Sequence, residues 1–315
     1  MSRAELIEST RAILTGAGYE VSSTLNLRSV CFDIVARRDD KLLIIKILSN
    51  VDAFSRENAE EMKVLAEALK ASPLLIGERS SSGVLELGIV YSRFNIPIIS
   101  NETLADHTIE EVPPLIFAAP GGLYVKLDGE LLKSIRNREG LSLGAIAEMA
   151  GVSRRTVQMY ESGMGAMIDA ALRIEEFLNT PMILPLDPFA YKTEDTANKY
   201  EITGAARTGS EVLNKLLDIG FSVTPVMKSP FDALSRVDEI IILTGTGSDE
   251  EKLIQRASVT SEVSSLAGRP SVVIVERTRD RNNIKTTAVI STEELRKIDD
   301  SDELTDLVMT RSTKK

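Results

Sequence analysis

Residues that often act at covalent or metal sites are scarce in this sequence of 315 residues. Its single cysteine, Cys31, cannot form an internal disulfide, and with the single histidine, His107, it cannot build a Cys/His zinc cluster. Cys31 lies beside Phe32 in an apolar stretch and is interpreted as an inert core thiol. In 244–251, "TGTGSDEE", the glycines precede acidic residues that would repel phosphate. We therefore expect no bound cofactor and no structural zinc.

Three charged residues near the N-terminus form a different candidate site. Asp33 is predicted on one strand, Lys46 on the next strand, and Glu5 on the opening helix. This arrangement resembles the PD-(D/E)xK fold of restriction endonucleases and archaeal Holliday-junction resolvases. The resemblance implies two strand carboxylates that hold a divalent metal and a lysine that orients or activates water.

The same pattern indicates that this nuclease site is degenerate. The residue two before Lys46 is Ile44, where the resemblance requires Asp or Glu, and isoleucine can neither bind metal nor act as a base. We therefore interpret Glu5, Asp33 and Lys46 as a remnant without metal or catalytic function, and we expect Asp33 and Lys46 to form a buried or semi-buried ion pair. The alternative is a structure-specific, metal-dependent nuclease.

The sharpest pattern is "LSLGAIAEMAGVSRRTVQMYESG", residues 141–163. Ile146 and Ala147 lie on one apolar helical face with Leu143. A glycine, Gly151, suits a turn with positive φ, and Ser153 is an N-cap for the next helix. The pattern predicts two helices joined by a tight turn. Val152 and Val157 are expected to complete the core, and Tyr160 is interpreted as a core residue. Leu131, Leu132 and Ile135 indicate a first helix before the motif, and at least one supporting helix after it is indicated by Ile168, Ala171, Leu172, Ile174 and Phe177.

Residues 128–178 resemble the Cro and phage-repressor helix-turn-helix. In that family the second helix of the motif lies in the DNA major groove, with its N-terminal residues on base edges. Carried onto this sequence, the resemblance implies a reading helix that starts at Ser153 and reads bases with Arg154, Arg155 and Met159. Arginine bonds guanine bidentately, so guanine is expected in each half-site.

The resemblance also assigns residues around this reading helix. Gln158 is expected on an adjoining exposed face. Phosphate contacts are expected from Thr156, Arg136, Arg138 and the backbone amides at the start of the helix at residue 143. Apolar residues follow the reading helix where the family is usually polar. These residues, Met164, Met167 and Ile168, are interpreted as either a dimer face or a surface that packs on a flanking domain.

Turn-rich stretches at 113–122 and 191–209 divide the chain into three expected domains. They are a degenerate nuclease-like α/β domain at 1–118, a helix-turn-helix domain at 126–190, and a second, diverged α/β domain at 209–311. The first is expected to form, in order, a helix at 3–17, strands at 20–23, 31–37 and 41–48, a helix at 55–71, a strand at 73–77, a helix-like stretch and a strand at 96–100.

The third segment repeats the order of the first, which indicates a duplication. The fold class is therefore multidomain α/β plus all-α, with two related restriction-endonuclease-like domains flanking a five-helix-type Cro/repressor domain. The matching stretches are "AGYEVS" (17–22) with "IGFSVT" (219–224), "FDIVARRDDKLLII" (32–45) with "FDALSRVDEIIIL" (231–243), "PLLIGERS" (73–80) with "PSVVIVERT" (270–278), and "IISNETL" (98–104) with "VISTEEL" (289–295).

Charge and hydropathy limit the function classes. The net charge of −10 argues against a protein that coats nucleic acid without sequence preference. The stretch 126–163 is close to neutral, so the acidic excess lies in the other segments. The longest apolar runs have strand length, and the N-terminus begins an amphipathic helix, so we expect a cytoplasmic protein without a membrane span.

Over nearly its full length the chain resembles a family of archaeal HTH-type transcriptional regulatory proteins. The most specific stretches are 32–55, "FDIVARRDDKLLIIKILSNVDAFS", and 153–161, "SRRTVQMYE". The resemblance implies a sequence-specific regulator that binds double-stranded DNA as a homodimer, with half-sites about one helical turn apart. An adaptor whose α/β domains bind another protein or a small effector is a further hypothesis.

Overall fold

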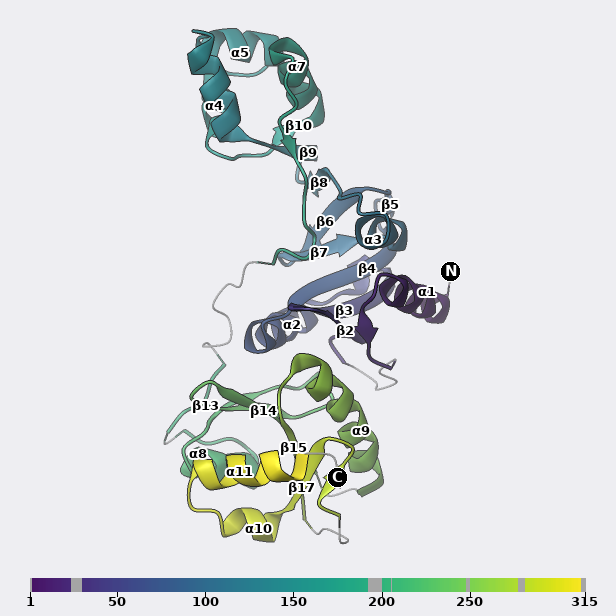
Figure 1. Cartoon of the computed structure of the whole chain (residues 1–315), viewed down its shortest axis with the longest axis vertical. Coiled ribbons are helices and arrows are strands. Elements are labelled where there is room, and N and C mark those ends of the chain that lie inside the picture. Colours follow the sequence, from purple (N-terminus) through teal and green to yellow (C-terminus); the bar gives the residue numbers. More distant parts are fainter. Residues whose placement is uncertain are drawn as a thin grey trace.

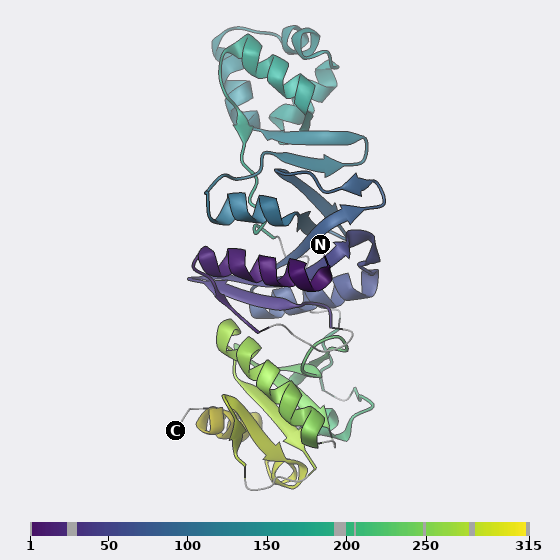
Figure 2. The same cartoon turned by 90° about the vertical axis from the view of Figure 1, so that its right-hand side faces the viewer.

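The computed structural model describes residues 2–23, 30–191, 200–204, 206–247, 250–276 and 281–312. The molecule is elongated, with three parts in a row (Figures 1 and 2). A helical module lies at one end, an N-terminal α/β unit in the middle and a C-terminal α/β unit at the other end. The helical module is thus central in the sequence but terminal in space, and only the N-terminal unit contacts both other parts in these views.

The N-terminal unit is a mixed sheet covered by helices on both faces. The long run "KLLIIKILSN" forms β3, and such an apolar, β-branched strand is typical of a sheet buried on both sides. Helices α1 and α3 cover one face and α2 covers the other. The elements are α1 (Arg3–Gly16), β1 (Glu20–Val21), β2 (Ile34–Arg38), β3 (Lys41–Asn50), the 3-10 turn η1 (Val51–Ala53), α2 (Arg56–Leu69), β4 (Ser72–Ser80), β5 (Gly83–Val84), β6 (Ile89–Arg93), β7 (Ile96–Ile99) and α3 (Asn101–Thr108).

One sequence expectation for this unit is wrong. The stretch between β4 and β7 was expected to be helix-like, but it forms the strands β5 and β6. Gly83 and Gly88 both adopt positive φ and interrupt any helix. The apolar residues on either side then pair with β4 and β7, and the sheet order becomes β1-β2-β3-β4-β7-β6.

A hairpin joins the helical module to this sheet. Strands β8 (Ile116–Ala119) and β9 (Gly122–Leu127) turn at Pro120 and Gly121, and β8 pairs in parallel with β6. The turn-rich stretch expected between two domains is therefore partly sheet. The same strand β9 also pairs with the short strands β10 (Ala166–Met167) and β11 (Ile183–Leu184) of the module.

The helical module contains α4 (Gly129–Arg138), α5 (Leu143–Ala150), α6 (Arg154–Glu161) and α7 (Ile168–Leu178). A five-helix type was expected, but these four are the helices of the module within the described residues 116–191. After α7 the chain pairs as β11 and returns to the N-terminal unit. Phe189 is buried there, and Ser72 Oγ donates to its carbonyl oxygen at 2.6 Å. The module is thus attached to the N-terminal unit by two segments.

The C-terminal unit has the same sheet order as the N-terminal unit. Its order is β12-β13-β14-β15-β17-β16, and β13 and β14 pair Ala233 with Thr244 as β2 and β3 pair Ile34 with Ile45. The elements are α8 (Glu211–Asp218), β12 (Ser222–Pro225), β13 (Ala233–Val237), β14 (Ile240–Gly247), α9 (Glu250–Ala267), β15 (Ser271–Val275), β16 (Asn283–Ile284), β17 (Thr287–Ser291), α10 (Thr292–Arg296) and α11 (Ser301–Ser312).

The two α/β units share one hydrophobic core. The cluster on the α2 face of the first unit is continuous with residues of the second, so that Phe32 and Phe231 are buried in the same cluster. Cys31 is also buried in it, and its backbone N–H donates to Lys228 O at 2.7 Å. Burial raises the pKa of the Cys31 thiol. This environment confirms the interpretation of Cys31 as a core thiol.

Polar contacts at this junction are reciprocal. Glu61 on α2 accepts hydrogen bonds from the backbone N–H groups of Met227 and Lys228, which follow the first strand of the C-terminal unit. Conversely, Glu262 on α9 accepts from the backbone N–H of Ser23, which follows the first strand of the N-terminal unit. Each unit therefore binds the other through a helix carboxylate, as two subunits of a symmetric dimer would do.

Replacing Glu262 by Gln should destabilise the junction in a pH-dependent way. Burial acts to raise the pKa of Glu262, but hydrogen bonds from Ser23 and Lys285 overcome it and hold the pKa below its ordinary value of 4.5. The stabilisation is therefore present above about pH 4.5 and lost as the pH falls through the folded-state pKa. We expect E262Q to lose about 1–2 kcal/mol at pH 7.

Urea unfolding at several pH values measures this effect. The difference between E262Q and wild type should narrow below pH 4.5. The matched control is Glu8→Gln on the exposed face of α1, which should unfold like wild type at every pH. A difference for E262Q that does not depend on pH would contradict the electrostatic explanation.

Candidate nucleic-acid interface

Local capping and a glycine build the helix-turn-helix as expected. Ser142 Oγ accepts from the backbone N–H of Ala145 and begins α5. Gly151 ends α5 at φ +71°, a conformation that favours glycine. Ser153 Oγ then accepts from the backbone N–H of Thr156 at 3.1 Å and begins α6. The sequence prediction of two helices joined at Gly151 is confirmed.

The module core fixes the orientation of α6. Ile146 and Ala147 on α5 and Val157 and Tyr160 on α6 are buried, as expected. The supporting helix expected after the motif is present as α7. Leu172 is 51% exposed and Phe177 is 40% exposed, because the buried face of α7 consists of other residues, namely Ala170, Ala171, Ile174 and Leu178.

The outward face of α6 carries the residues expected to read bases. Arg154, Arg155, Gln158 and Met159 are all exposed. The last three of these line one open hollow together with two residues that follow α6, Ser162 and Met164. The face is therefore polar and cationic at the start of α6 and has a methionine patch towards its end.

Arg154 lies somewhat apart from the other exposed α6 residues. An added Cβ at Gly144 would lie 3.0 Å from Arg154 Nε, so the guanidinium lies against the start of α5. Free backbone N–H groups at a helix start attract phosphate. Arg154 is thus next to the place where the α5 amides could hold a DNA phosphate.

Two of the residues expected at phosphates have partners within the protein. Arg136 binds Glu161 through two hydrogen bonds, Nε to Oε1 at 2.5 Å and Nη2 to Oε2 at 3.2 Å, and its side chain is only 15% exposed. These bonds raise the pKa of Arg136. Arg136 therefore joins α4 to the end of α6 and orients it. Thr156 Oγ1 lies 2.8 Å from Ser153 Oγ at the helix start.

Three further side chains of the sequence predictions lie near α6. Arg138 is exposed at the end of α4 and contacts only its neighbour Glu139, at 3.4 Å, in the interactions described. Met164 belongs to the α6 hollow, and Met167 is exposed beside the β8–β9 hairpin, where its Cε would lie 3.7 Å from a Cβ at Gly122. Sequence reasoning missed Glu161, although its polar type at the end of an amphipathic helix was a weak signal for a partner.

The nuclease-like residues of the N-terminal unit form a buried ionic cluster. Asp33 is 2% exposed, and its carboxylate lies 3.3 Å from Lys46 Nζ and 2.6 Å from Arg3 Nη2. It also accepts from the backbone N–H of Ile47 at 2.8 Å. Lys46 Nζ donates in addition to Val30 O at 2.8 Å. The expected ion pair of Asp33 and Lys46 is confirmed.

Glu5 does not belong to this cluster, which corrects the remnant set. Its carboxylate accepts from the backbone N–H of Ser2 at 2.8 Å and completes a capping box at the start of α1. That bond lowers the pKa of Glu5. The neighbour of Asp33 on α1 is instead the cation Arg3. No pattern in the sequence distinguished Arg3 from Glu5, since both lie on the first turn of the helix.

The C-terminal unit repeats this cluster with a different cation. Asp232 accepts from the backbone N–H of Thr246 at 2.6 Å, as Asp33 does from Ile47. Arg256 on α9 binds Asp232 at 2.7 Å and donates to Pro230 O at 3.2 Å. The cation of this cluster comes from the helix α9, whereas the N-terminal unit uses both Arg3 of α1 and Lys46 of β3. The strand β14 itself contains no lysine.

Neither cluster fits a divalent metal. Asp33 is bonded to two cations and Asp232 to one, and each also accepts from a backbone N–H. In the N-terminal unit Ile44 is fully buried where a second metal carboxylate would be needed. Within the described residues, no group of three or more His, Cys, Asp or Glu side chains could hold a metal ion. The clusters are internal ion pairs in both units.

Comparisons with known proteins match both parts of this structure. The model of the PD-(D/E)XK superfamily domain matches residues 3–114, and that of the helix-turn-helix family matches residues 132–183. The fold and the α6 face thus define a helix-turn-helix protein built on a PD-(D/E)XK superfamily domain. No solved structure matches the chain.

Full-length relatives identify the family. A protein of Methanocella arvoryzae is 40% identical, and the match covers 100% of this chain and 98% of the relative. A protein of Natronomonas pharaonis is 41% identical, with 99% of both chains covered. A protein of Archaeoglobus fulgidus is 38% identical, with 98% of both chains covered. Each is named "putative HTH-type transcriptional regulatory protein". The chain belongs to this family of archaeal HTH-type transcriptional regulatory proteins. In the described part of the chain, no helix is both long and apolar enough to span a membrane.

Replacing Asp33 by Ala should strongly destabilise the N-terminal unit. Lys46 is 8% exposed, and without Asp33 its ammonium group is buried beside Arg3 with no carboxylate partner. Removing one partner of a buried ion pair typically costs about 3–5 kcal/mol. We expect a loss in the lower part of that range, about 3 kcal/mol, because Arg3 is partly exposed.

Thermal unfolding of D33A, K46M and the double variant checks this prediction. The double variant should lose less stability than the sum of the two single variants, since K46M removes the buried charge that D33A leaves unpaired. The control is Asp40→Ala at the exposed β2–β3 turn, which should unfold like wild type. Additive losses would show that Asp33 and Lys46 do not interact energetically.

Proposed function

We propose that this protein is a sequence-specific DNA-binding transcriptional regulator that reads the major groove with α6. The observation that carries the proposal is the exposed face of α6. Arg155, Gln158 and Met159 point outward there, while Val157 and Tyr160 of the same helix are buried in the module. The helix-turn-helix family match and the names of the relatives support it.

The residue types on α6 suit base edges. Arg155 can bond guanine O6 and N7, Gln158 can bond adenine N6 and N7, and Met159 can contact a thymine methyl group. Arg154 lies against the start of α5, so it can contact a phosphate there or turn towards a base. Arg138, Thr156 and the first amides of α5 are the proposed phosphate contacts. Arg136 acts instead as a positioning residue through Glu161.

The nearly neutral module implies few phosphate contacts for each chain, so tight binding should need two chains on one operator. We therefore propose a homodimer on an inverted repeat. The surface between the α/β units is already buried within one chain, so the dimer contact must lie elsewhere. Exposed apolar side chains of the module offer such a surface, namely Met149, Leu172 and Phe177.

We propose that the C-terminal unit arose as a diverged copy of the N-terminal unit. The shared sheet order, the shared β-strand register and the two aspartate clusters support a duplication. The two copies then form an internal pseudo-dimer that serves as a scaffold for the helical module. We also propose a cytoplasmic location, because a transcriptional regulator of an archaeal cell acts on DNA in the cytoplasm.

Selection of oligonucleotides from a random duplex pool tests the DNA-reading function. The wild type should enrich an inverted repeat with half-sites about one helical turn apart. Arg155→Ala should cost about 1–3 kcal/mol of binding and relax the preference at one base pair in each half-site. Arg154→Ala should weaken binding by a similar amount with a smaller change of preference.

The control variant is Arg296→Ala, which removes the same charge from the exposed face of α10 in the C-terminal unit. Its enriched motif and affinity should match those of the wild type. A pool without any enriched motif for the wild type would contradict sequence-specific binding. A single asymmetric motif would contradict the homodimer, but it would still agree with base reading by α6.

We further propose that the nuclease-like units do not cleave DNA, because cations and an isoleucine occupy the positions that a metal site requires. Duplex and branched DNA incubated with the protein and Mg²⁺ or Mn²⁺ should stay intact. Gel electrophoresis of labelled strands measures this. Metal-dependent cleavage that disappears in D33A, with the fold retained by circular dichroism, would establish a nuclease instead.

A further inference from the structure

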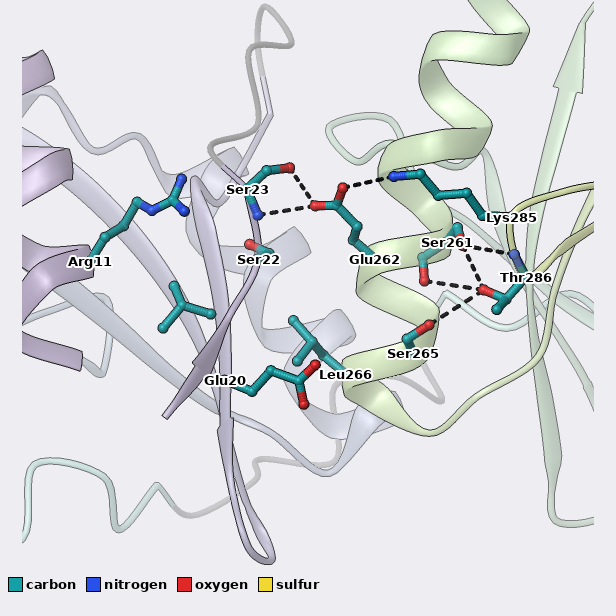
Figure 3. Close-up of a pocket in the computed structure, with 11 residues that line it drawn as sticks. Arg11, Glu20, Ser22, Ser23, Ser261, Glu262, Ser265, Leu266, Lys285 and Thr286 are labelled. Atoms are coloured by element: carbon teal, nitrogen blue, oxygen red, sulfur yellow. Dashed lines mark hydrogen bonds and ion pairs between the residues drawn. The ribbon is translucent and has the colours of Figure 1, made fainter. Parts of the chain in front are cut away.

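The hollow at the junction of the two α/β units contains polar groups that bond one another. Figure 3 shows that Glu262 bonds both Ser23 and Lys285, and that Ser261 bonds Thr286 at 2.5 Å. These groups hold the two units and the β16–β17 turn in place. A second hollow, on the outward face of α6, differs because exposed side chains line it. They are Arg155, Gln158, Met159, Ser162 and Met164.

The α6 hollow, with a volume of about 340 Å³, has a polar end and an apolar end. Arg155 lies on the first turn of α6, whereas Met159 lies on its last turn. Met164 follows the helix and lines the same hollow, so two thioether side chains lie at its apolar end. Met159 is 43% exposed and Met164 is 37% exposed. Exposed apolar side chains that lie together indicate a contact surface.

The backbone fixes Met164 beside the end of α6. Its N–H donates to the carbonyl oxygen of Met159 at 2.9 Å. The preceding residue, Gly163, has φ +91°, a conformation that favours glycine and lets the chain turn there. The following residue, Gly165, packs against Phe117 of β8, where an added Cβ would lie 2.5 Å from the ring. Met164 is therefore held between the end of α6 and the β8–β9 hairpin, and its side chain stays in the hollow.

The apolar group that a DNA major groove presents is the methyl group of thymine. Apolar side chains that contact this C5-methyl group distinguish thymine from cytosine. Successive bases of one strand are about 3.4 Å apart along the helix axis. Met159 and Met164 leave the backbone at neighbouring positions, because their backbone groups share a hydrogen bond. Their flexible, polarisable side chains can therefore reach the methyl groups of two adjacent thymines.

We propose that Met164 is a base-reading residue which, together with Met159, recognises the methyl groups of adjacent thymines in each half-site. The inference rests on the proposed function of α6 and extends its reading surface beyond the helix itself. DNA is the occupant that the hollow favours, because the methionines are continuous with Arg155 and Gln158 on the same exposed face. The guanine bound by Arg155 and the thymines contacted by the methionines then lie at opposite ends of the contact.

Deoxyuridine in place of thymine tests the proposal, because it removes only the 5-methyl group. In the duplex that the wild type enriches, each half-site thymine is replaced in turn, and fluorescence anisotropy measures the affinity of the full chain. Replacing a contacted thymine should weaken binding by about fourfold for each methyl group lost, as expected for one buried methyl group. Met164→Ala should lose this difference at one thymine, whereas Met164→Leu, which keeps an apolar side chain, should retain it.

The matched control is Met227→Ala, which removes an exposed methionine from the C-terminal unit and should distinguish thymine from deoxyuridine as the wild type does. The proposal is overturned if no deoxyuridine substitution changes the wild-type affinity. It is equally overturned if Met164→Ala weakens binding to the thymine and deoxyuridine duplexes by the same factor, as a role in protein contact or stability would. A half-site without thymine also overturns it and leaves base reading by α6 intact. A pool without any enriched motif contradicts the proposed function itself, and this inference with it.

Discussion

The burial of two sheet faces in one shared core is the constraint on which the rest of the structure depends. Each α/β unit has a mixed sheet, and a sheet of this kind must be covered on both faces. In the N-terminal unit α1 and α3 cover one face, and α2 covers the other only together with the C-terminal unit. Residues such as Phe32 and Phe231 are therefore buried by the partner unit. This makes the two units a single scaffold.

Within that scaffold Asp33 and Asp232 take part in ion pairs. Asp33 and Asp232 each accept a hydrogen bond from a backbone N–H of the adjacent strand of the hairpin, that of Ile47 in β3 and that of Thr246 in β14. This bond holds the start of the strand that follows each aspartate in place. Their remaining acceptor capacity goes to cations, Arg3 and Lys46 in one unit and Arg256 in the other. These bonds compensate for the cost of burying the charged carboxylate, but they leave none of its oxygens available to coordinate a divalent ion.

The attachment of the helical module explains how such a scaffold serves DNA reading. The β8–β9 hairpin extends the N-terminal sheet, and the returning segment fixes Phe189 next to His107 on α3. The helical module is therefore joined to the N-terminal unit by paired strands and packed side chains. Within it, the ion pair of Arg136 and Glu161 connects α4 to the end of α6. A recognition helix held in this way keeps its exposed face in one orientation, which specific contacts to base edges require.

Local signals in the sequence determined much of this protein. The caps Ser142 and Ser153 and the turn at Gly151 depend on the chain within a few residues, so the helix-turn-helix could be predicted in place. The isoleucine at position 44 likewise indicated that one carboxylate of the PD-(D/E)xK pattern is missing. Pairs of matching strands indicated that the third segment has the same order as the first, and the sheets show that order.

Contacts between residues far apart in the chain were decided only by the tertiary structure. Arg3 and Arg256 reach their aspartates from helices, and nothing in the spacing of the sequence marks a helical cation as the partner of a strand carboxylate. The strands β5 and β6 form because neighbouring strands offer them hydrogen bonds, which the local pattern of 77–96 does not show. The hollow at the junction exists only because two units pack face to face. Sequence periodicity fixes which face of an element is apolar, whereas packing decides what covers it.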